Sequence, residues 1–364
     1  MAVVSASSFI EVLQSLPLLA PEQRAQLPAL QQQFPDLKAL AQELIKRGWL
    51  THYQVQHLLS GKANALVLGT YVLLQRLGEG GMGQVFKARH YEHGRTVALK
   101  IIRKENVLDT ESVGRFQREM QVTSRLEHPN VVHALEAGPL GGTLALIMEY
   151  VEGTDLDRLV KERGPLPVAE ACDFLRQAAL GLQHIHEHGL IHRDIKPSNL
   201  LVTTDNRGLA HGPLVKILDL GLARLQDGHH GKKMTRLADG KSLTTLTLDG
   251  GAATLGSIDY LSPEQALDFH RVDIRGDIYS LGCTFFFMLT GKPPFGSGSL
   301  AIKLMRHQQA EPPDLQQHRP EALTARLRMS ASSSTSKIVS VPPAGLGGRD
   351  RAGVGAVALC ERGR

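Results

Sequence analysis

The spacing of apolar residues predicts a small helical module at the start of the chain. Two helical faces are expected there, one from Phe9, Val12, Leu13 and Leu16 and one from Leu37, Leu40, Leu44 and Ile45. Gly48 would end the second helix. Thr51-His52-Tyr53-Gln54 fits a capping box, which would open a third helix that runs through Leu59. Residues 1–62 are therefore expected to form a separate helical unit.

The pattern then changes to short apolar runs typical of strands. Tyr71–Leu74 leads into a glycine-rich string, and Val85–Ala88 and Thr96–Ile102 follow as the two arms of a hairpin. The string reads G-x-G-x-x-G-x-V and consists of Gly78, Glu79, Gly80, Gly81, Met82, Gly83 and, one residue further on, Val85. Glycines without a Cβ let backbone amides approach phosphates. A dinucleotide-binding unit would instead need a helix directly after the glycines, so the following strand favours a loop that covers a nucleotide.

A lysine on an apolar strand is the next candidate for chemistry. Lys100 closes the string Val97-Ala98-Leu99-Lys100, where an ammonium is costly unless it meets an opposite charge. Phosphates would supply that charge. An amphipathic helix expected over residues 110–126 carries Glu119. The alternatives are a lysine that extends to water and a solvated surface glutamate.

Two acids and an amide follow at spacings that suit phosphoryl transfer. Ile191–Asn199 places Asp194 two residues before Lys196 and five before Asn199. Asp219 follows the apolar run Val215–Leu218 and precedes a glycine. Such residues can hold a hydroxyl, contact a phosphate and ligate Mg²⁺. A turn-forming Asp before Gly is the alternative for Asp219.

From about Tyr71 to about Pro320 the chain resembles a eukaryotic-type serine/threonine protein kinase, of the kind that bacteria also carry. The motifs quoted above carry the resemblance, together with His128-Pro129-Asn130 and Ile147–Gly153. The resemblance implies an α+β fold with two lobes, an antiparallel β-sheet N-lobe and a helical C-lobe. It also implies Mg²⁺ and ATP as cofactors.

The resemblance assigns a role to each motif residue. Asp194, Lys196, Lys100 and Glu119 would be catalytic, and Asn199 and Asp219 would ligate the metal. The ATP-binding residues would be Gly78, Glu79, Gly80, Gly81, Met82, Gly83, Val85, Ala98, Lys100, Glu149, Val151 and Leu201.

The expected acceptor is Ser or Thr of a protein. Lys196 and Ser257 stand where serine/threonine kinases carry a Lys and a Ser or Thr, and the segment from Asp219 to Ser262-Pro263-Glu264 is long. The expected sites of autophosphorylation in that segment, through a transient homodimer, are Thr244, Thr245, Thr247 and Thr254. Arg193 would bind the added phosphate.

The resemblance implies a further helix and weakens after it. Asp277 in Arg275–Gly282 would brace the catalytic loop, and Cys283–Leu289 would be a core helix, too short to cross a bilayer. The C-lobe is expected to be incomplete, with Glu264 lacking its arginine partner and residues 321–364 forming a disordered tail rich in Ser, Gly and Arg. A non-catalytic ATP-binding scaffold is therefore the alternative function.

Charge and composition narrow the remaining function classes. The formal net charge is +5, and residues 319–364 alone hold eight Lys or Arg against three Asp or Glu. The rest of the chain is neutral, which argues against specific nucleic-acid binding. There is no apolar run of 18 residues and no basic leader, so we expect a cytoplasmic protein without a membrane span. The helical module would either pack on the N-lobe or dock partners.

Overall fold

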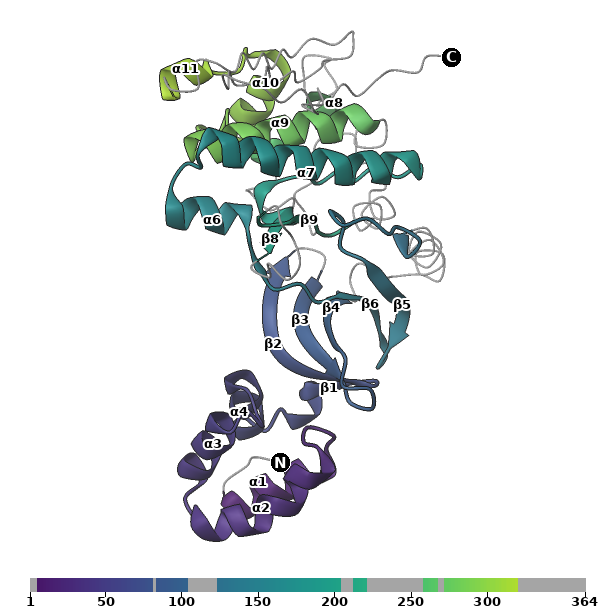
Figure 1. Ribbon diagram of the computed structural model, residues 1–364, viewed down its shortest axis with the longest axis vertical. Helices are drawn as coiled ribbons and strands as arrows, with labels where there is room; N and C mark the ends of the chain where they lie inside the picture. The colour runs from purple at the N-terminus through teal and green to yellow at the C-terminus, as the bar shows by residue number, and fades with distance from the viewer. Residues whose placement is uncertain are drawn as a thin grey trace, which may run out of the picture. The chain divides into compact units, whose positions relative to one another are not determined.

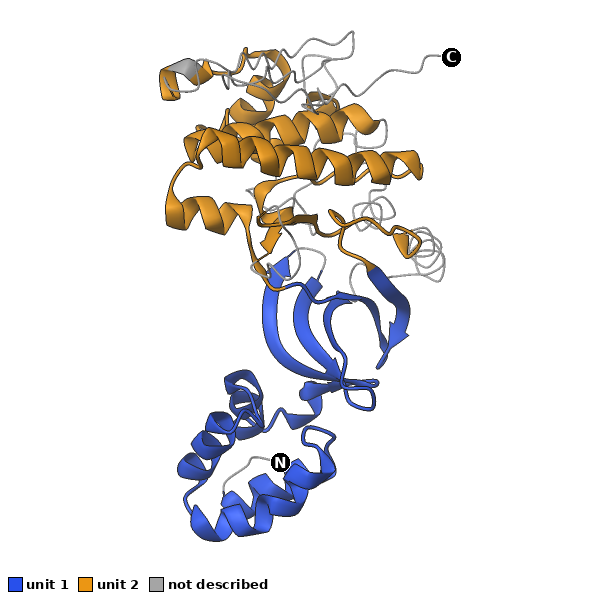
Figure 2. Cartoon of the chain, in the orientation of Figure 1, with its two compact units in different colours: residues 1–120, 134–151 blue, residues 121–133, 152–364 orange. Residues whose placement is uncertain are grey.

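The computed structural model describes residues 5–80, 83–103, 123–203, 212–220, 258–267 and 272–319 (Figure 1). The chain forms two compact units (Figure 2). The N-terminal unit consists of Met1–Met120 and Ala134–Val151, and the C-terminal unit of Gln121–His133 and Glu152–Arg364. Each unit has hydrophobic core clusters of its own.

Four helices begin the N-terminal unit. They are α1 (Ala6–Ser15), α2 (Pro21–Gln33), α3 (Leu37–Lys46) and α4 (His52–Leu59). The side chains of Ser5, Asp36 and Thr51 cap the first, third and fourth helices by accepting a backbone N–H, which stabilises each helix start. The predicted capping box at Thr51 is confirmed.

Helix α2 was not predicted from the sequence. Pro21 starts it, but Pro28 lies inside it, where a proline is unfavourable. Only Leu27 and Leu30 are buried from this helix. Its place in the fold therefore comes from packing rather than from its own propensity.

The four helices share a core with the adjoining sheet. Their cluster includes buried side chains from every helix, with Leu66 and Val72 among its fully buried members. Leu66 belongs to a short 3₁₀ turn, η1 (Ala63–Leu66), and Val72 to the sheet. The helical module thus packs directly on the sheet of its own unit.

The sheet has six antiparallel strands. In chain order they are β1 (Val67–Leu68), β2 (Tyr71–Gly80), β3 (Gly83–His90), β4 (Thr96–Ile102), β5 (Ala134–Leu140) and β6 (Thr143–Glu149), and in space the order is β1-β2-β3-β4-β6-β5. The predicted hairpin is confirmed, since β3 pairs with β4 from Gly83–Ile102 to Arg89–Thr96. The predicted antiparallel N-lobe sheet is confirmed with it.

The C-terminal unit is mainly helical, as predicted. Its core lies between α6 (Leu156–Arg163), α7 (Val168–Glu187) and α9 (Ile274–Thr290). A small antiparallel sheet covers one part of this core, in the order β7 (Gly153–Asp155), β8 (Leu200–Thr203) and β9 (Val215–Ile217). Shorter elements complete the unit: η3 (Pro197–Asn199), η5 (Ile258–Tyr260), α8 (Pro263–Leu267), α10 (Leu300–Gln309) and α11 (Leu315–His318).

The predicted apolar helix at Cys283–Leu289 is confirmed as part of α9. All seven of these residues are buried, and Asp273 caps the helix start. Gly291 ends the helix with a φ of 72°, a left-handed conformation that glycine adopts at little cost. Glu264 on α8 is half-buried. Within the described ranges no helix is both long enough and apolar enough to span a membrane.

Several predicted residues lie outside the described part of the chain. They are Gly81, Met82, Glu119, Thr244, Thr245, Thr247, Thr254 and Ser257, and the tail from residue 320 onward is also outside it.

Candidate active site

The segment between α7 and β8 brings three of the predicted site residues together. The Lys196 ammonium donates to both carboxylate oxygens of Asp194, at 3.0 and 2.8 Å. The Asn199 amide donates to the Asp194 carboxylate at 3.0 Å and to its backbone carbonyl at 2.7 Å. The Asp194 side chain is 41% exposed, so it can reach a hydroxyl from solvent while its two neighbours hold it.

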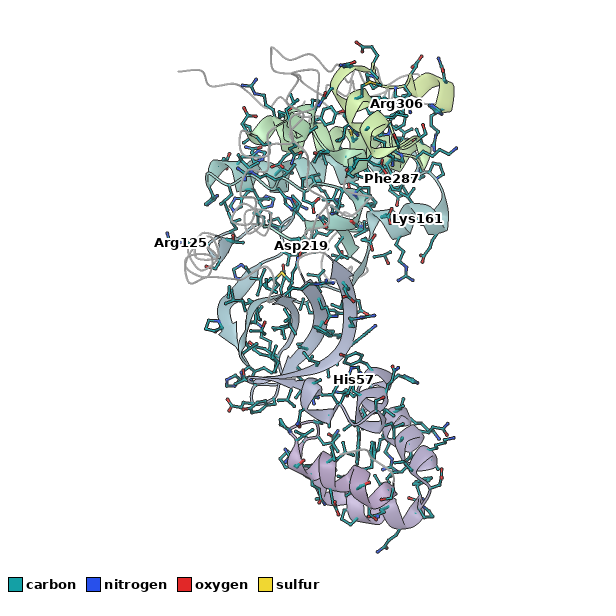
Figure 3. All side chains as sticks on the ribbon, turned by 180° about the vertical axis from the view of Figure 1, so that it is seen from behind. His57, Arg125, Lys161, Asp219, Phe287 and Arg306 are labelled. Atoms are coloured by element: carbon teal, nitrogen blue, oxygen red, sulfur yellow. The ribbon has the colours of Figure 1, made fainter. Side chains whose placement is uncertain are left out.

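His192 joins this loop to the strand that leads to Asp219. The Asp194 N–H lies 3.3 Å from His192 Nδ1, and Nε2 lies 2.7 Å from the carbonyl oxygen of Leu218. If Nδ1 accepts, Nε2 carries the proton and donates. The Leu218 N–H in turn donates to the Asn199 carbonyl at 2.9 Å. Asp219 follows Leu218 directly, so this network fixes the backbone that carries Asp219, whose side chain is labelled in Figure 3.

Asp277 on α9 holds the loop from the helical side. Its carboxylate accepts the His192 N–H at 2.8 Å and the Arg193 N–H at 2.7 Å. Its oxygen also lies 2.9 Å from Nε2 of His186 on α7. The Asp277 side chain is fully buried, so these hydrogen bonds compensate for its lost hydration. The predicted brace beneath the catalytic loop is confirmed.

The backbone is in an unusual conformation beside Asp194 and at Asp219. Arg193 and Asp219 have φ angles of 64° and 60°, and they are the only non-glycine residues with positive φ in the described ranges. Such conformations cost free energy for residues with a Cβ and are concentrated at functional sites. Gln265, which is buried on α8, donates to the Arg193 carbonyl at 2.7 Å and so supports one of them.

Gln265 and His186 were missed in the sequence analysis. Gln265 follows directly after the Ser262-Pro263-Glu264 motif, and His186 alternates with His184 and His188 at the end of α7. Neither pattern indicates a partner. Their roles depend on which elements come together in the fold, so the sequence held no usable signal for them.

The two residues predicted to ligate the metal, Asn199 and Asp219, suit a hard divalent cation. Asn199 uses its Nδ2 on Asp194, which leaves Oδ1 as the atom for a cation. Asp219 would add a carboxylate oxygen. Mg²⁺ takes few protein ligands and prefers oxygen atoms, so this donor set fits it.

The glycine-rich turn belongs to the N-terminal unit. A Cβ added at Gly78 or Gly80 would meet no atom within 4 Å, so packing does not require glycine at either position. Open space beside the backbone is what an approaching phosphate needs. At Gly83, by contrast, a Cβ would overlap the carbonyl of Ile101. Glu79, between the first two glycines, pairs with Arg76 and Arg103 on the surface, at 2.9 and 2.8 Å.

The structure also locates Lys100 and the residues predicted to surround adenine. Lys100 is 5% exposed on β4, where it pairs with Val85 of β3 and Leu146 of β6. The other residues are distributed over both units: Ala98 pairs with Met148, Glu149 ends β6, Val151 follows in the same unit, and Leu201 lies on β8 of the C-terminal unit.

The profile of the protein kinase domain matches residues 71–340 of this chain. The chain belongs to the protein kinase family. Curated relatives of this kinase domain include a probable serine/threonine-protein kinase of Clostridium perfringens, 36% identical over 71% of this chain and 34% of the relative. The serine/threonine-protein kinase PrkC of Bacillus subtilis is 34% identical over 70% of this chain and 35% of the relative. The chain thus spans about a third of the length of these relatives.

A solved structure agrees with the fold of the kinase domain. The crystal structure of the Mycobacterium tuberculosis PknI kinase domain matches with a TM-score of 0.51 and 26% sequence identity. The match covers 71% of this chain and 84% of that chain. The predicted family and the predicted two-lobed α+β fold are therefore confirmed.

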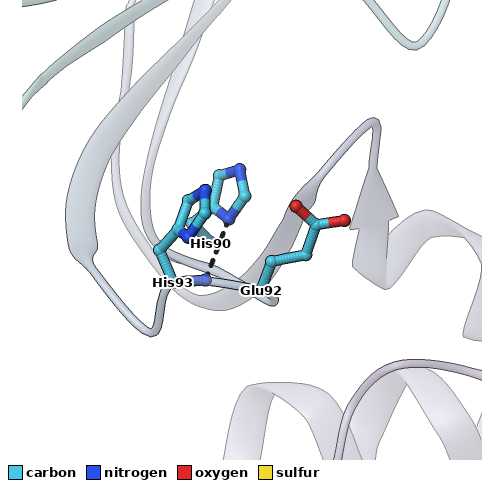
Figure 4. A group of neighbouring side chains, drawn as sticks. All are labelled: His90, Glu92 and His93. Carbon is cyan, nitrogen blue, oxygen red and sulfur yellow. Dashed lines mark hydrogen bonds between the residues drawn. The ribbon is translucent and has the colours of Figure 1, made fainter.

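A second group of polar side chains lies on the turn between β3 and β4 of the kinase domain. His90, Glu92 and His93 offer potential metal-ligating atoms that all lie within 4.8 Å of one another (Figure 4). The sequence analysis missed them, although His-Tyr-Glu-His was a usable signal. Nδ1 of His90 already accepts the His93 N–H at 3.3 Å, and Glu92 and His93 are exposed. Proximity is therefore the only observation that favours a metal here, and it does not assign one.

Proposed function

We propose that this chain transfers the γ-phosphate of Mg-ATP to serine or threonine hydroxyls of protein substrates. The observation that carries the proposal is the hydrogen-bonded group of Asp194, Lys196 and Asn199, supported by the kinases named above. A domain that consumes ATP works where ATP is available, so we place it in the cytoplasm.

Each residue of this group has a defined task in transfer. Asp194 orients the acceptor hydroxyl and accepts its proton as the oxygen attacks phosphorus. Lys196 places its ammonium beside Asp194, where it stabilises negative charge on the phosphoryl group. Lys100 would contact the α and β phosphates with Glu119 as its partner. When bound, Mg²⁺ neutralises charge on the phosphates, and Asn199 and Asp219 would hold it.

The replacement Asp194→Asn tests the role of the base. It keeps the shape of the side chain and removes the proton acceptor, so phosphoryl transfer should fall by about 10² to 10⁴ while ATP binding is retained. The measurement is incorporation of labelled phosphate into a generic protein substrate, with nucleotide affinity measured on the same samples.

Asp157→Asn is the matched control. Asp157 pairs with Lys161 on the surface of α6, and its replacement should leave transfer unchanged. A transfer rate in Asp194→Asn equal to that of the parent would contradict the assigned role. If both the parent and Asp194→Asn bind nucleotide but transfer no phosphate, the result would favour a non-catalytic ATP-binding scaffold.

Autophosphorylation among Thr244, Thr245, Thr247 and Thr254 is part of the same proposal. Arg193 is the expected phosphate receptor, since a guanidinium binds phosphate through two hydrogen bonds. Phosphopeptide mapping after incubation with Mg-ATP should find at least one of the four modified. If a transient homodimer is the route, the specific rate should rise with protein concentration; a constant rate would indicate reaction within one molecule.

A further inference from the structure

The N-terminal helical module contacts strand β2 at an irregular point of its pairing. Leu73 pairs with Ala88 of β3 and Gln75 with Lys87, so Leu74 is an extra residue in β2. An extra residue of this kind interrupts the ladder and leaves backbone groups without their strand partner. The carbonyls at this bulge therefore need partners from elsewhere.

Helix α4 supplies those partners. The Thr51 hydroxyl donates to the Leu74 carbonyl at 2.5 Å, and the Gln54 amide donates to the Leu73 carbonyl at 3.0 Å. Gln54 is 1% exposed, so its hydrogen bond is shielded from water.

The same two side chains also form the capping box of α4. Thr51 Oγ1 accepts the Gln54 N–H at 3.2 Å, and Gln54 Oε1 accepts the Thr51 N–H at 2.9 Å. Each side chain thus has one bond within the helix and one to the strand. The start of α4 and the bulge in β2 are consequently fixed to one another.

A ring contact extends the connection to the second strand of the hairpin. Tyr53 lies between the two capping residues in sequence, and its ring centroid is 6.1 Å from that of Phe86 on β3. Tyr53 packs against both the helical core and the core of the sheet. Helix α4 therefore contacts both strands that flank the glycine-rich turn.

The position of this contact gives it a consequence for the turn. Residues Tyr71–Leu73 are buried and Leu74 is half-buried, but every residue from 75 to 80 is exposed. Beyond the bulge, β2 depends on its pairing with β3 rather than on a core, and that pairing shifts register once more between Arg76 and Gly78. Register in an exposed strand is weakly specified unless something fixes it, and here the fixed point is four residues before Gly78.

We propose that Thr51 and Gln54 are positioning residues for the nucleotide-binding hairpin formed by β2 and β3. They hold this hairpin through the bulge at Leu74. The module is then part of the ATP site's support, and any event that withdraws α4 weakens ATP binding. This inference rests on the proposed function, because it takes the turn at Gly78–Gly83 as the phosphate-binding segment.

The test compares two variants of the full-length chain that each lose one helix cap. Thr51→Ala removes a cap and the bond to Leu74, whereas Asp36→Ala removes only the cap of α3, where Asp36 accepts the Ala39 N–H at 2.9 Å. Thr51→Ser restores the hydroxyl. The readouts are the Kd of a fluorescent ATP analogue, the KM for ATP against kcat, and hydrogen exchange of the amides of residues 75–80.

Thr51→Ala should raise the Kd and the KM roughly fivefold, with kcat unchanged, and should speed exchange in β2 by a similar factor. Asp36→Ala and Thr51→Ser should match the parent. Equal values in Thr51→Ala and Asp36→Ala would overturn the inference.

A second variant and the exchange readout keep the test decisive. If Thr51→Ala does not fold, Gln54→Glu replaces it, because a carboxylate still accepts the Thr51 N–H but cannot donate to Leu73. Its Kd should rise in the same way, and a parental Kd would count against the inference. A parent that binds no ATP would refute the proposed function, while exchange in β2 would still support or overturn the role of α4.

Discussion

At the scale of single residues, the catalytic loop depends on one buried carboxylate. Asp277 accepts two backbone N–H groups of the loop and lies within hydrogen-bond distance of His186. All three partners come from segments more than 80 residues away in sequence. The loop is therefore held by a residue that belongs to a different element.

Replacing Asp277 should unfold this arrangement. Asp277→Ala leaves the N–H groups of His192 and Arg193 buried without an acceptor, which should cost about 2 to 5 kcal/mol. Denaturant unfolding measures this cost. Asp273→Ala, which removes an exposed cap from the same helix, should cost only about 1 kcal/mol. Equal losses in the two variants would show that the buried bonds to the loop contribute little.

A buried histidine should make stability depend on pH. Burial lowers the pKa of His307 to about 4, and its Nδ1 lies 2.8 Å from the Tyr279 hydroxyl. Because the unfolded chain binds a proton near pH 6.5 and the folded chain does not, stability is complete above pH 6.5 and falls between pH 6.5 and 4. Protonation of His307 should lower the free energy of unfolding by roughly 2 to 3 kcal/mol between pH 6.5 and 4.

Unfolding free energies across that pH window check the prediction. His307→Gln cannot take up the proton, so its stability should change less with falling pH than that of the parent. Parallel pH profiles for the two proteins would contradict the assigned role of His307.

At the scale of elements, the two ends of the glycine-rich turn differ in why they need glycine. Gly83→Ala should weaken the β3–β4 pairing, because its Cβ would overlap the Ile101 carbonyl. The expected loss of unfolding free energy is about 1 to 3 kcal/mol, which lowers Tm by several degrees. Gly78→Ala meets no atom and should leave Tm nearly unchanged, but it should weaken ATP binding. Thermal melts of both variants test this difference. Equal melting temperatures would show that packing does not distinguish Gly83 from Gly78.

Helix α2 shows how an element can form without a strong local signal. Its interior Pro28 argues against a helix, yet Leu27 and Leu30 are buried in the same cluster as residues of α1, α3 and α4. The predicted helices around it carried strong apolar faces and were found. Tertiary burial can therefore override propensity in one element of a bundle.

At the scale of the whole molecule, the helical module and the sheet belong to one compact unit. Removing residues 1–62 should expose the apolar surfaces around Leu66 and Val72 and should leave the carbonyls of Leu73 and Leu74 without their donors. Exposure of the two side chains should cost about 3 to 6 kcal/mol.

Thermal unfolding of the truncated chain tests this expectation. It should melt well below the full chain, or fail to stay in solution. An unchanged Tm would show that the sheet is stable without the module. Adding residues 1–62 as a separate peptide should restore part of the lost stability if the surfaces are complementary.

The sequence by itself determined the family and the local chemistry of this protein. The G-x-G-x-x-G-x-V string, the Asp194-x-Lys196-x-x-Asn199 spacing and the apolar strands are local patterns, and short-range sterics and hydrogen bonding are enough to interpret them. The capping box at Thr51 and the glycine end of α9 were likewise predictable from adjacent residues.

Only the tertiary structure decided which distant groups support that chemistry. Gln265 on Arg193 spans 72 positions, His186 on Asp277 spans 91, and the capping residues of α4 reach a bulge about 20 positions away. A hydrogen bond between distant segments leaves no periodic trace in a sequence, because its partners are set by how the elements pack. The sequence thus named the candidate reacting groups, and the fold decided what holds them.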